Sequence, residues 1–159
     1  MIFVTVGSQM PFDRLIRAVD RWAMTHADQQ VVAQIGDSAY VPQAMAYDHS
    51  LPPAEFVRRM MEAEVVIAHA GMGTIISAAE FCKPMVLLPR RGSLRETRND
   101  HQVATAKWLR TKPGIFVADS EDELPAVLAR ALADSADIGL SGALPVAMIA
   151  SLKSIIRQL

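Results

Sequence analysis

A glycine-containing segment at residues 69–74, with the sequence HAGMGT, has the composition of an anion site. It follows a β-branched run at residues 65–68 that predicts a strand, and it precedes a stretch that predicts a helix. Free N–H groups and the positive dipole at a helix start attract an anion. Gly71 and Gly73 leave room for a diphosphate, and Thr74 adds a hydroxyl donor. A glycine turn that binds nothing is the alternative.

The spacing of these glycines excludes two common nucleotide-binding motifs. Ile76 occupies the position where a dinucleotide-binding turn has its third glycine. No Lys-Ser/Thr pair follows the glycines, as a Walker phosphate loop requires. The segment therefore indicates an anion at a helix start without naming its chemistry.

A second glycine turn occupies residues 7–13, with the sequence GSQMPFD, directly after the first apolar run. Gly7 and Ser8 are small, so the backbone there can approach a ligand closely. The alternative is a tight turn in which Asp13 caps the following helix.

Residues 89–102, with the sequence PRRGSLRETRNDHQ, combine arginines with amide and imidazole side chains. Guanidinium groups there would neutralise a phosphate or a carboxylate, and a solvated basic loop is the alternative. We expect Asn99 or Asp100 to cap the next helix. His101 and Gln102 then lie in its first turn, where their side chains suit sugar hydroxyls.

Short apolar runs alternate with amphipathic stretches along the chain, which predicts β/α units. The inner runs are continuously apolar, as in a parallel sheet covered on both faces. We therefore predict a single α/β domain of the Rossmann-like, doubly wound kind over residues 1–135, followed over 136–159 by a flexible stretch and a C-terminal helix. The loosest part is expected at 134–142. Trp22 and Trp108 stand at helical spacing and are predicted to be core. The predicted strands are 2–6, 31–35, 44–47, 65–68, 85–88 and 115–118, and the predicted helices are 12–25, 53–63, 74–82, 101–109, 121–133 and 144–159.

The composition excludes several classes of protein. With 159 residues, 51% of them hydrophobic and 21% charged, the chain can form one folded domain and is not disordered. Its single cysteine, Cys82, excludes a disulfide scaffold, and a net charge of −1 argues against a nucleic-acid partner. No apolar run approaches the roughly 20 residues that span a membrane. The start of the chain lacks an export signal, so we expect a cytoplasmic location. Scattered histidines and the absence of an Asp-x-Asp pair predict no metal and no cofactor.

Taken together, five motifs resemble the glycosyltransferase family 28 C-terminal domain over residues 1–135, most closely its stand-alone subunits. The motifs are VTVGS at residues 4–8, FD at 12–13, HAGMGT at 69–74, KP at 83–84 and NDHQ at 99–102. The resemblance implies the C-terminal, donor-binding half of a GT-B fold, with a UDP-sugar as the donor substrate. In the split enzymes of this kind, the acceptor half is a separate, membrane-anchored subunit and the acceptor is a saccharide on a polyprenyl diphosphate.

The resemblance implies a metal-independent, inverting transfer in exopolysaccharide or capsule synthesis, at the inner face of the membrane through the partner subunit. His69 and His101 are the candidates for the catalytic base, which the partner could equally provide. Many relatives bind the ribose through a Glu at the position of Ser77, and Glu80, one helical turn later, is the nearest carboxylate. The arginines of residues 89–102 hint at an acidic sugar such as glucuronate. The expected donor-binding residues are Gly7, Ser8, Gly71, Met72, Gly73, Thr74, Ser77, Glu80, Arg90, Arg98, Asn99, Asp100, His101 and Gln102.

Two other functions compete with this hypothesis. One is a non-catalytic subunit that stabilises or enhances a membrane glycosyltransferase. The other is a generic nucleotide-binding α/β domain, which the missing third glycine and missing Walker lysine disfavour. An apolar stripe expected along the last helix, with Val146, Ile149 and Leu152 among its members, packs either on its own domain or on the acceptor subunit.

Overall fold

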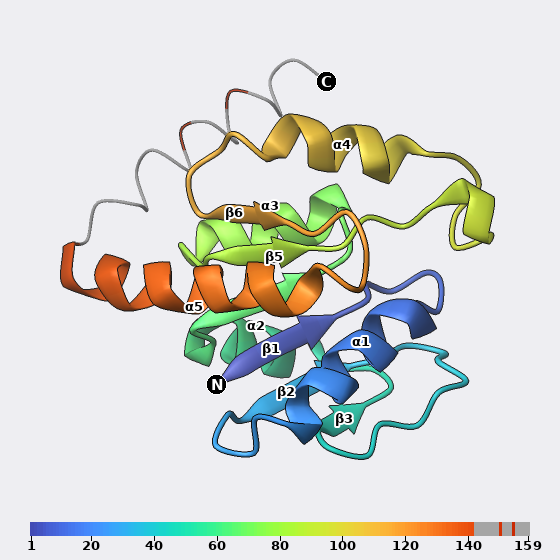
Figure 1. Ribbon diagram of the computed structural model, residues 1–159, viewed down its shortest axis with the longest axis horizontal. Helices are drawn as coiled ribbons and strands as arrows, with labels where there is room; N and C mark the ends of the chain where they lie inside the picture. Colours follow the sequence, from blue (N-terminus) through green and yellow to red (C-terminus); the bar gives the residue numbers. More distant parts are fainter. Residues whose placement is uncertain (142–149, 151–153, 155–159) are drawn as a thin grey trace.

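The computed structural model describes residues 1–141 together with Ala150 and Ser154. Its strands alternate with helices along the chain, except where the third strand follows the second directly (Figure 1). The helix expected at 144–159 and its apolar stripe lie outside the described residues, apart from those two positions. None of the described helices combines the length and the apolar character needed to cross a membrane. The strands are β1 (Ile2–Thr5), β2 (Val31–Gln34), β3 (Ala46–Asp48), β4 (Val65–Ala68), β5 (Met85–Leu87) and β6 (Ile115–Val117). The helices are α1 (Asp13–Met24), α2 (Pro53–Glu62), α3 (Met72–Glu80), the 3₁₀ helix η1 (Gly92–Leu94), α4 (His101–Leu109) and α5 (Leu124–Ser141).

The described strands form one sheet in the order β3-β2-β1-β4-β5-β6, and every neighbouring pair is parallel. β1 lies at the centre, where Ile2 is in register with Val31 on one side and Val65 on the other. The predicted doubly wound α/β fold is therefore confirmed. The strand order reverses between β1 and β4, and in open sheets of this kind ligands bind beyond the carboxyl ends of the strands at such a reversal.

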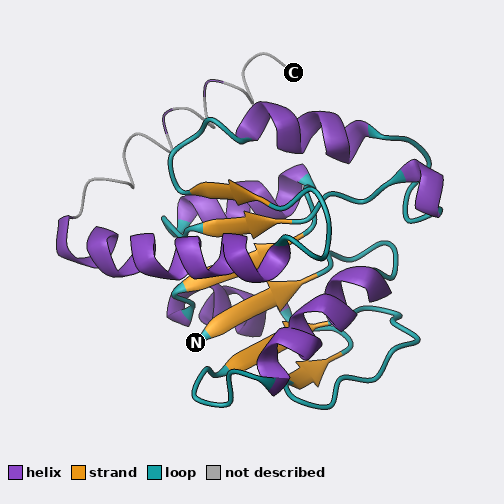
Figure 2. Ribbon diagram, in the orientation of Figure 1, coloured by secondary structure: helices purple, strands orange, loops and turns teal. Residues whose placement is uncertain are grey.

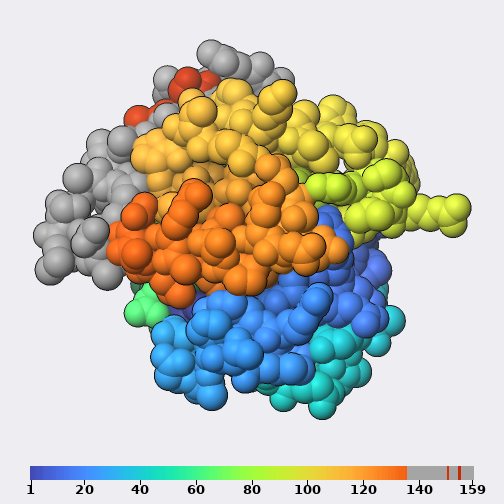
Figure 3. Space-filling model, viewed as in Figure 1, coloured from blue at the N-terminus to red at the C-terminus, as the bar shows by residue number. Residues whose placement is uncertain are grey.

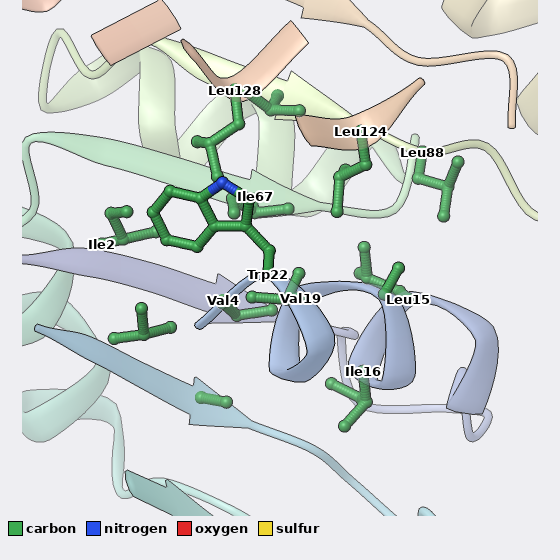
Figure 4. Close-up of a cluster of buried hydrophobic side chains, with 14 of the residues drawn as sticks. Ile2, Val4, Leu15, Ile16, Val19, Trp22, Ile67, Leu88, Leu124 and Leu128 are labelled. Carbon is green, nitrogen blue, oxygen red and sulfur yellow. The ribbon is translucent and has the colours of Figure 1, made fainter. Parts of the chain in front are cut away.

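Two layers of helices cover the sheet, one on each face (Figure 2). Ile2 and Val4 of β1 pack with residues of α1 and α5, whereas Phe3 points to the opposite face, against α2, α3 and α4. This alternation follows from the period of two in a β-strand. Figure 4 shows the first of these clusters, in which Trp22 of α1 lies between the sheet and α5.

Trp108 is the exception among the predicted core tryptophans. Trp22 is buried, but the side chain of Trp108 on α4 is 44% exposed, so its prediction was wrong. The buried residues of α4 are Ala106 and Leu109, and the indole instead lies under the Lys112 ammonium, 5.1 Å from the ring centre. A cation over an aromatic face stabilises such an exposed ring.

Helix α5 is longer than the sequence indicated. It continues to Ser141, through most of the stretch at 134–142 that we expected to be loose. The stretch contains no proline, and its alanine and leucine residues favour a helix. The helical part of the stretch, residues 134–141, contains one glycine, Gly139, which costs only about 1 kcal/mol relative to Ala. The prediction of a loose stretch, which rested on its Asp, Ser and Gly residues, was therefore wrong over residues 134–141.

Candidate functional site

A pocket of about 280 Å³ lies at the carboxyl end of the sheet, at the reversal between β1 and β4. Its walls come from the segments that follow β1, β4 and β5, and two of these segments are the predicted glycine turns. In the space-filling view, the segment after β5 projects from the body of the domain on the right (Figure 3). The lining residues are Val6, Gly7, Ser8, Gln9, Met10, His69, Gly71, Gly73, Thr74, Arg90, Thr97 and Gln102.

The start of α3 forms the floor of the predicted anion site. Gly71 is its N-cap, no side chain caps it, and the N–H of Ile75 bonds the Gly71 carbonyl at 3.1 Å. The preceding N–H groups of the first turn have no intrahelical partner, as at every helix start. A Cβ placed on Gly73 would meet no atom within 4 Å, so the space beside this first turn is open. Uncapped N–H groups and an open pocket together suit an anionic ligand.

The other two pocket glycines make room for a side chain of the protein. A Cβ on Gly71 would lie 2.1 Å from Cε1 of His69, and one on Gly7 would lie 2.6 Å from its Nε2. Gly7 also has a φ of +76°, which favours glycine on its own. We expected Gly71 to leave room for a diphosphate, but it leaves room for the imidazole, and only Gly73 faces free space.

His69 is held between the two glycine turns and is mostly buried. Its Nε2 lies 3.4 Å from the Thr74 hydroxyl, and its Nδ1 lies 3.1 Å from the Gln102 amide nitrogen. Burial first, and the positive charge of Arg90 second, lower the pKa of His69 to about 4. The imidazole is therefore neutral at physiological pH.

Gln102 joins the segments that follow β4 and β5. Its Oε1 accepts hydrogen bonds from the backbone N–H groups of Ala70 and Arg90, both at 3.1 Å. Its amide nitrogen contacts His69 as described. The side chain that we assigned to a sugar contact therefore uses its oxygen inside the protein.

Arg90 also serves the protein more than we expected. It is 3% exposed, and its guanidinium donates to the carbonyls of Val6, Met10 and Pro11, each at 2.7 Å, and to that of Glu96 at 3.3 Å. These contacts fix the segment after β1, so the guanidinium that we expected to contact a phosphate also holds backbone at the pocket wall. Burial lowers the pKa of Arg90, which remains far above neutrality, and its charge stays beside the pocket.

The Glu96 carboxylate connects the arginine-rich segment, residues 89–102, to α1. Glu96 accepts two bonds from the Arg14 guanidinium, at 2.7 and 2.9 Å, and one from the backbone N–H of Arg91 at 2.9 Å. Arg14 and Glu96 are each 12% exposed, so the pair is shielded from water. The fixed segment brings Thr97 to the pocket wall.

The remaining predicted donor-binding residues do not line this pocket. Arg98 and His101 are exposed, as is Glu80 on α3. Two others act as turn residues, because Asn99 accepts from the His101 N–H and Asp100 accepts from the Gly92 N–H. Asp100 stands at the N-cap of α4 without making the capping bond we expected. The predicted donor-binding residues that lie outside the pocket lining are Met72, Ser77, Glu80, Arg98, Asn99, Asp100 and His101.

Four pocket residues were not predicted. Gln9 and Met10 directly extend the predicted turn at Gly7 and Ser8, so the length of that turn was the available signal. Val6 ends the first apolar run, and Thr97 lies within the arginine-rich segment. Among the described residues, no group of three histidine, cysteine or carboxylate side chains is placed to hold a metal ion.

Known proteins similar to this chain are glycosyltransferases. A transferase from Leptospira interrogans is 36% identical over 70 residues, which are 44% of this chain and 18% of that protein; it is described as UDP-N-acetylglucosamine–N-acetylmuramyl-(pentapeptide) pyrophosphoryl-undecaprenol N-acetylglucosamine transferase. The structure of Acinetobacter baumannii MurG matches with a TM-score of 0.54 and 19% identity, over 99% of this chain and 49% of that one. A calicheamicin glycosyltransferase matches with a TM-score of 0.62 and 18% identity, over 96% of this chain and 38% of that one.

These proteins are all longer than this chain, which spans less than half of each in these alignments. At this level of identity the structural matches establish the shared fold, that of the GT-B glycosyltransferases. The sequence model of one protein family matches residues 1–152, which are almost the whole chain. With its doubly wound sheet and its glycine turn at the start of α3, the chain belongs to the glycosyltransferase family 28 C-terminal domain family.

Proposed function

We propose that this chain is the donor-binding subunit of a split, inverting glycosyltransferase that transfers a sugar from UDP to a saccharide on a polyprenyl diphosphate. The observation that carries the proposal is the uncapped first turn of α3, with Gly73 open to a pocket at the sheet reversal. The diphosphate of the donor would lie there, opposite the buried charge of Arg90. The family and the relative from Leptospira interrogans support the class of donor and acceptor.

The chemistry follows from the charge that develops during transfer. An acceptor hydroxyl attacks the anomeric carbon from the face opposite the diphosphate, the bond from that carbon to the phosphate oxygen breaks, and UDP leaves with both bonding electrons. The helix N–H groups, the Thr74 hydroxyl and the nearby Arg90 charge stabilise the negative charge on the leaving group. We propose that these groups make a metal ion unnecessary.

A general base takes the proton of the acceptor hydroxyl. His101 is exposed at the start of α4 and is one candidate, and a group from the acceptor-binding half is the other. Ser77 and Glu80 lie further along α3, where a ribose contact would extend the site beyond the pocket. We further propose that the acceptor half is a membrane-anchored subunit, which would hold this chain at the inner face of the membrane during exopolysaccharide synthesis.

Binding is tested first, by titrating the protein with UDP in a calorimeter. We expect binding that depends on the diphosphate, so that uridine alone binds much more weakly. Absence of UDP binding would contradict the proposal that this chain holds the donor site. A panel of UDP-sugars in thermal shift then identifies the sugar, since a bound ligand raises the melting temperature by mass action.

Catalysis is tested with the chain and its partner purified together. Gly73→Leu fills the open space beside α3 and should abolish sugar transfer by the complex if the donor binds there. A complex that contains Gly73→Leu and keeps full activity would instead identify this chain as a non-catalytic, stabilising subunit.

A further inference from the structure

We infer that Gln102 is a positioning residue, which fixes His69 as the neutral tautomer with its proton on Nε2, so that the imidazole donates a hydrogen bond at the pocket and does not act as a base. The tautomer follows from hydrogen bonds within the chain. The role toward a diphosphate rests on the proposed function.

The orientation of the Gln102 amide is determined by its two backbone neighbours. The N–H groups of Ala70 and Arg90 both point to one atom, at 3.1 Å each. Two donors require an acceptor, so this atom is the carbonyl oxygen Oε1. Rotating the amide by half a turn would place an NH₂ group against both donors and leave two N–H groups without a partner. The other end of the amide, 3.1 Å from His69, is therefore the NH₂ group.

This orientation decides which imidazole nitrogen carries the proton. An NH₂ group only donates, so the His69 Nδ1 that faces it accepts and carries no hydrogen. A neutral imidazole has one N–H, which must then be on Nε2. Nε2 lies on the side of the ring that faces Gly7 and Thr74, both of which line the pocket.

The charged form of His69 is disfavoured by its surroundings. An imidazolium needs a proton on Nδ1, which would be directed at the donor hydrogens of Gln102. The positive charge of the Arg90 guanidinium acts on the ring and repels a second positive charge there. In the described part of the chain, the hydrogen-bond partners of this imidazole are Gln102 and Thr74, and neither is a carboxylate.

The result is a pair of donors at the pocket. Nε2–H points to the Thr74 oxygen at 3.4 Å, which is longer than the usual N–H···O distance and leaves the hydrogen available to a ligand oxygen. The Thr74 hydroxyl keeps its own hydrogen free to donate. Both hydrogens are placed beside the first turn of α3, where the diphosphate is proposed to bind. A base would need a free lone pair on Nε2, so the catalytic base is a different group.

The tautomer is measured directly by NMR of protein labelled with ¹⁵N-histidine, in spectra that correlate the ring carbons' hydrogens with both ring nitrogens. We expect His69 to show a protonated Nε2 and an unprotonated Nδ1 in the absence of ligand at neutral pH. His26 and His49 are internal controls, because their Nδ1 atoms lie 2.8 Å from backbone carbonyls and must carry the proton. A proton on Nδ1 of His69 would overturn the inference whether or not any nucleotide binds.

The role of Gln102 is tested by Gln102→Glu. A carboxylate still accepts from the N–H groups of Ala70 and Arg90, so the junction between the two segments is kept. Its second oxygen can only accept, so Nδ1 of His69 should become protonated, in the neutral or in the charged imidazole. A variant that folds with Nδ1 still unprotonated and the proton still on Nε2 would show that Gln102 does not fix the tautomer. If the variant fails to fold, Gln102→Met with the same spectrum takes its place and should give a mixture of the two tautomers.

The donor role is tested with UDP and with inorganic pyrophosphate as ligands. His69→Gln places an amide N–H close to the position of Nε2 and should bind both ligands within a few-fold of wild type. His69→Leu lacks the donor and should bind roughly tenfold to a hundredfold more weakly, as expected for the loss of a hydrogen bond to a charged group. Equal binding by the two variants would overturn the donor role while leaving the proposed function intact. A wild-type protein that binds neither ligand would refute the proposed function, and the tautomer would still be decided by NMR.

Discussion

Gly73→Ala should stabilise the free protein and weaken its binding of UDP. Gly73 is the second residue of α3, and a Cβ there meets nothing within 4 Å, so alanine adds helix propensity without a clash. Exchanging Gly for Ala in a helix gains roughly 0.5–1 kcal/mol. For a chain of this size, that gain raises the melting temperature by roughly 1–4 °C.

The same methyl group occupies the space in which the diphosphate is proposed to bind. Overfilling a fitted site costs about 1–3 kcal/mol, which corresponds to roughly tenfold to a hundredfold weaker binding. The assay is a thermal melt without ligand, followed by calorimetric titration with UDP under the same conditions. Wild-type affinity in Gly73→Ala would refute the placement of the diphosphate at the start of α3.

Gly71→Ala is the matched control, two residues away in the same turn. Its Cβ would lie 2.1 Å from Cε1 and 2.7 Å from Nδ1 of His69, so the imidazole or the backbone has to move. We expect a loss of about 1–3 kcal/mol and a melting temperature lower by several degrees. If the two variants shift the melting temperature in the same direction, our account of what each glycine makes room for is wrong.

Three further predictions concern buried or shielded polar groups, at the site and away from it. First, wild type should lose stability relative to His69→Gln as the pH falls. The difference between their free energies of unfolding should decrease by up to about 3 kcal/mol from about pH 6.5 to pH 4 and then level off. The unfolded imidazole takes up a proton in this range, whereas burial and the Arg90 charge keep the folded pKa at about 4; urea titrations at several pH values measure the difference, and a constant difference would contradict it. Second, Glu96→Gln should cost about 1–3 kcal/mol and expose the arginine-rich segment to protease, because it removes the carboxylate that accepts two hydrogen bonds from the shielded Arg14 guanidinium and leaves only Glu121, 3.0 Å away, to balance that charge. Third, Asp20→Ala should cost about 3–5 kcal/mol in urea unfolding, because the buried carboxylate accepts from the Tyr40 hydroxyl and from two backbone N–H groups; a cost below about 1 kcal/mol would show that these donors find other partners.

The sequence predicted the architecture well because the fold depends on local patterns. Continuously apolar runs indicate strands covered on both faces, and the structure has them in one parallel sheet. The same pattern predicted the edge of the sheet at which the pocket lies, because the carboxyl ends of parallel strands meet at one edge. Helix α4 begins at His101 as predicted, but α5 continues past its predicted end. Helix propensity over residues 134–141 outweighed a composition that is common in loops.

The directions of the side chains at the site could not be predicted in the same way. Arg90 donates to Val6 and Met10, which are 84 and 80 positions away in the chain. Gln102 donates to His69, 33 positions away. Nothing in the spacing of these residues shows that the side chains turn inward, because residue type gives the chemistry of a group and only the folded chain gives its partner. The same holds for Gly71, whose missing Cβ is explained by an imidazole two residues earlier.

This distinction decides how mutations at the site should be interpreted. If the proposed function holds, replacing Arg90 or Gln102 should reduce sugar transfer even where neither touches the donor, because Arg90 holds the segment after β1 and Gln102 joins the segments after β4 and β5. Replacing a residue of this kind lowers the stability of the protein and its ligand binding together. Gly73 behaves in the opposite way, since its replacement by alanine is expected to raise stability while it weakens binding. The sign of the stability change therefore separates groups that build the pocket from groups that face the ligand, and activity alone does not.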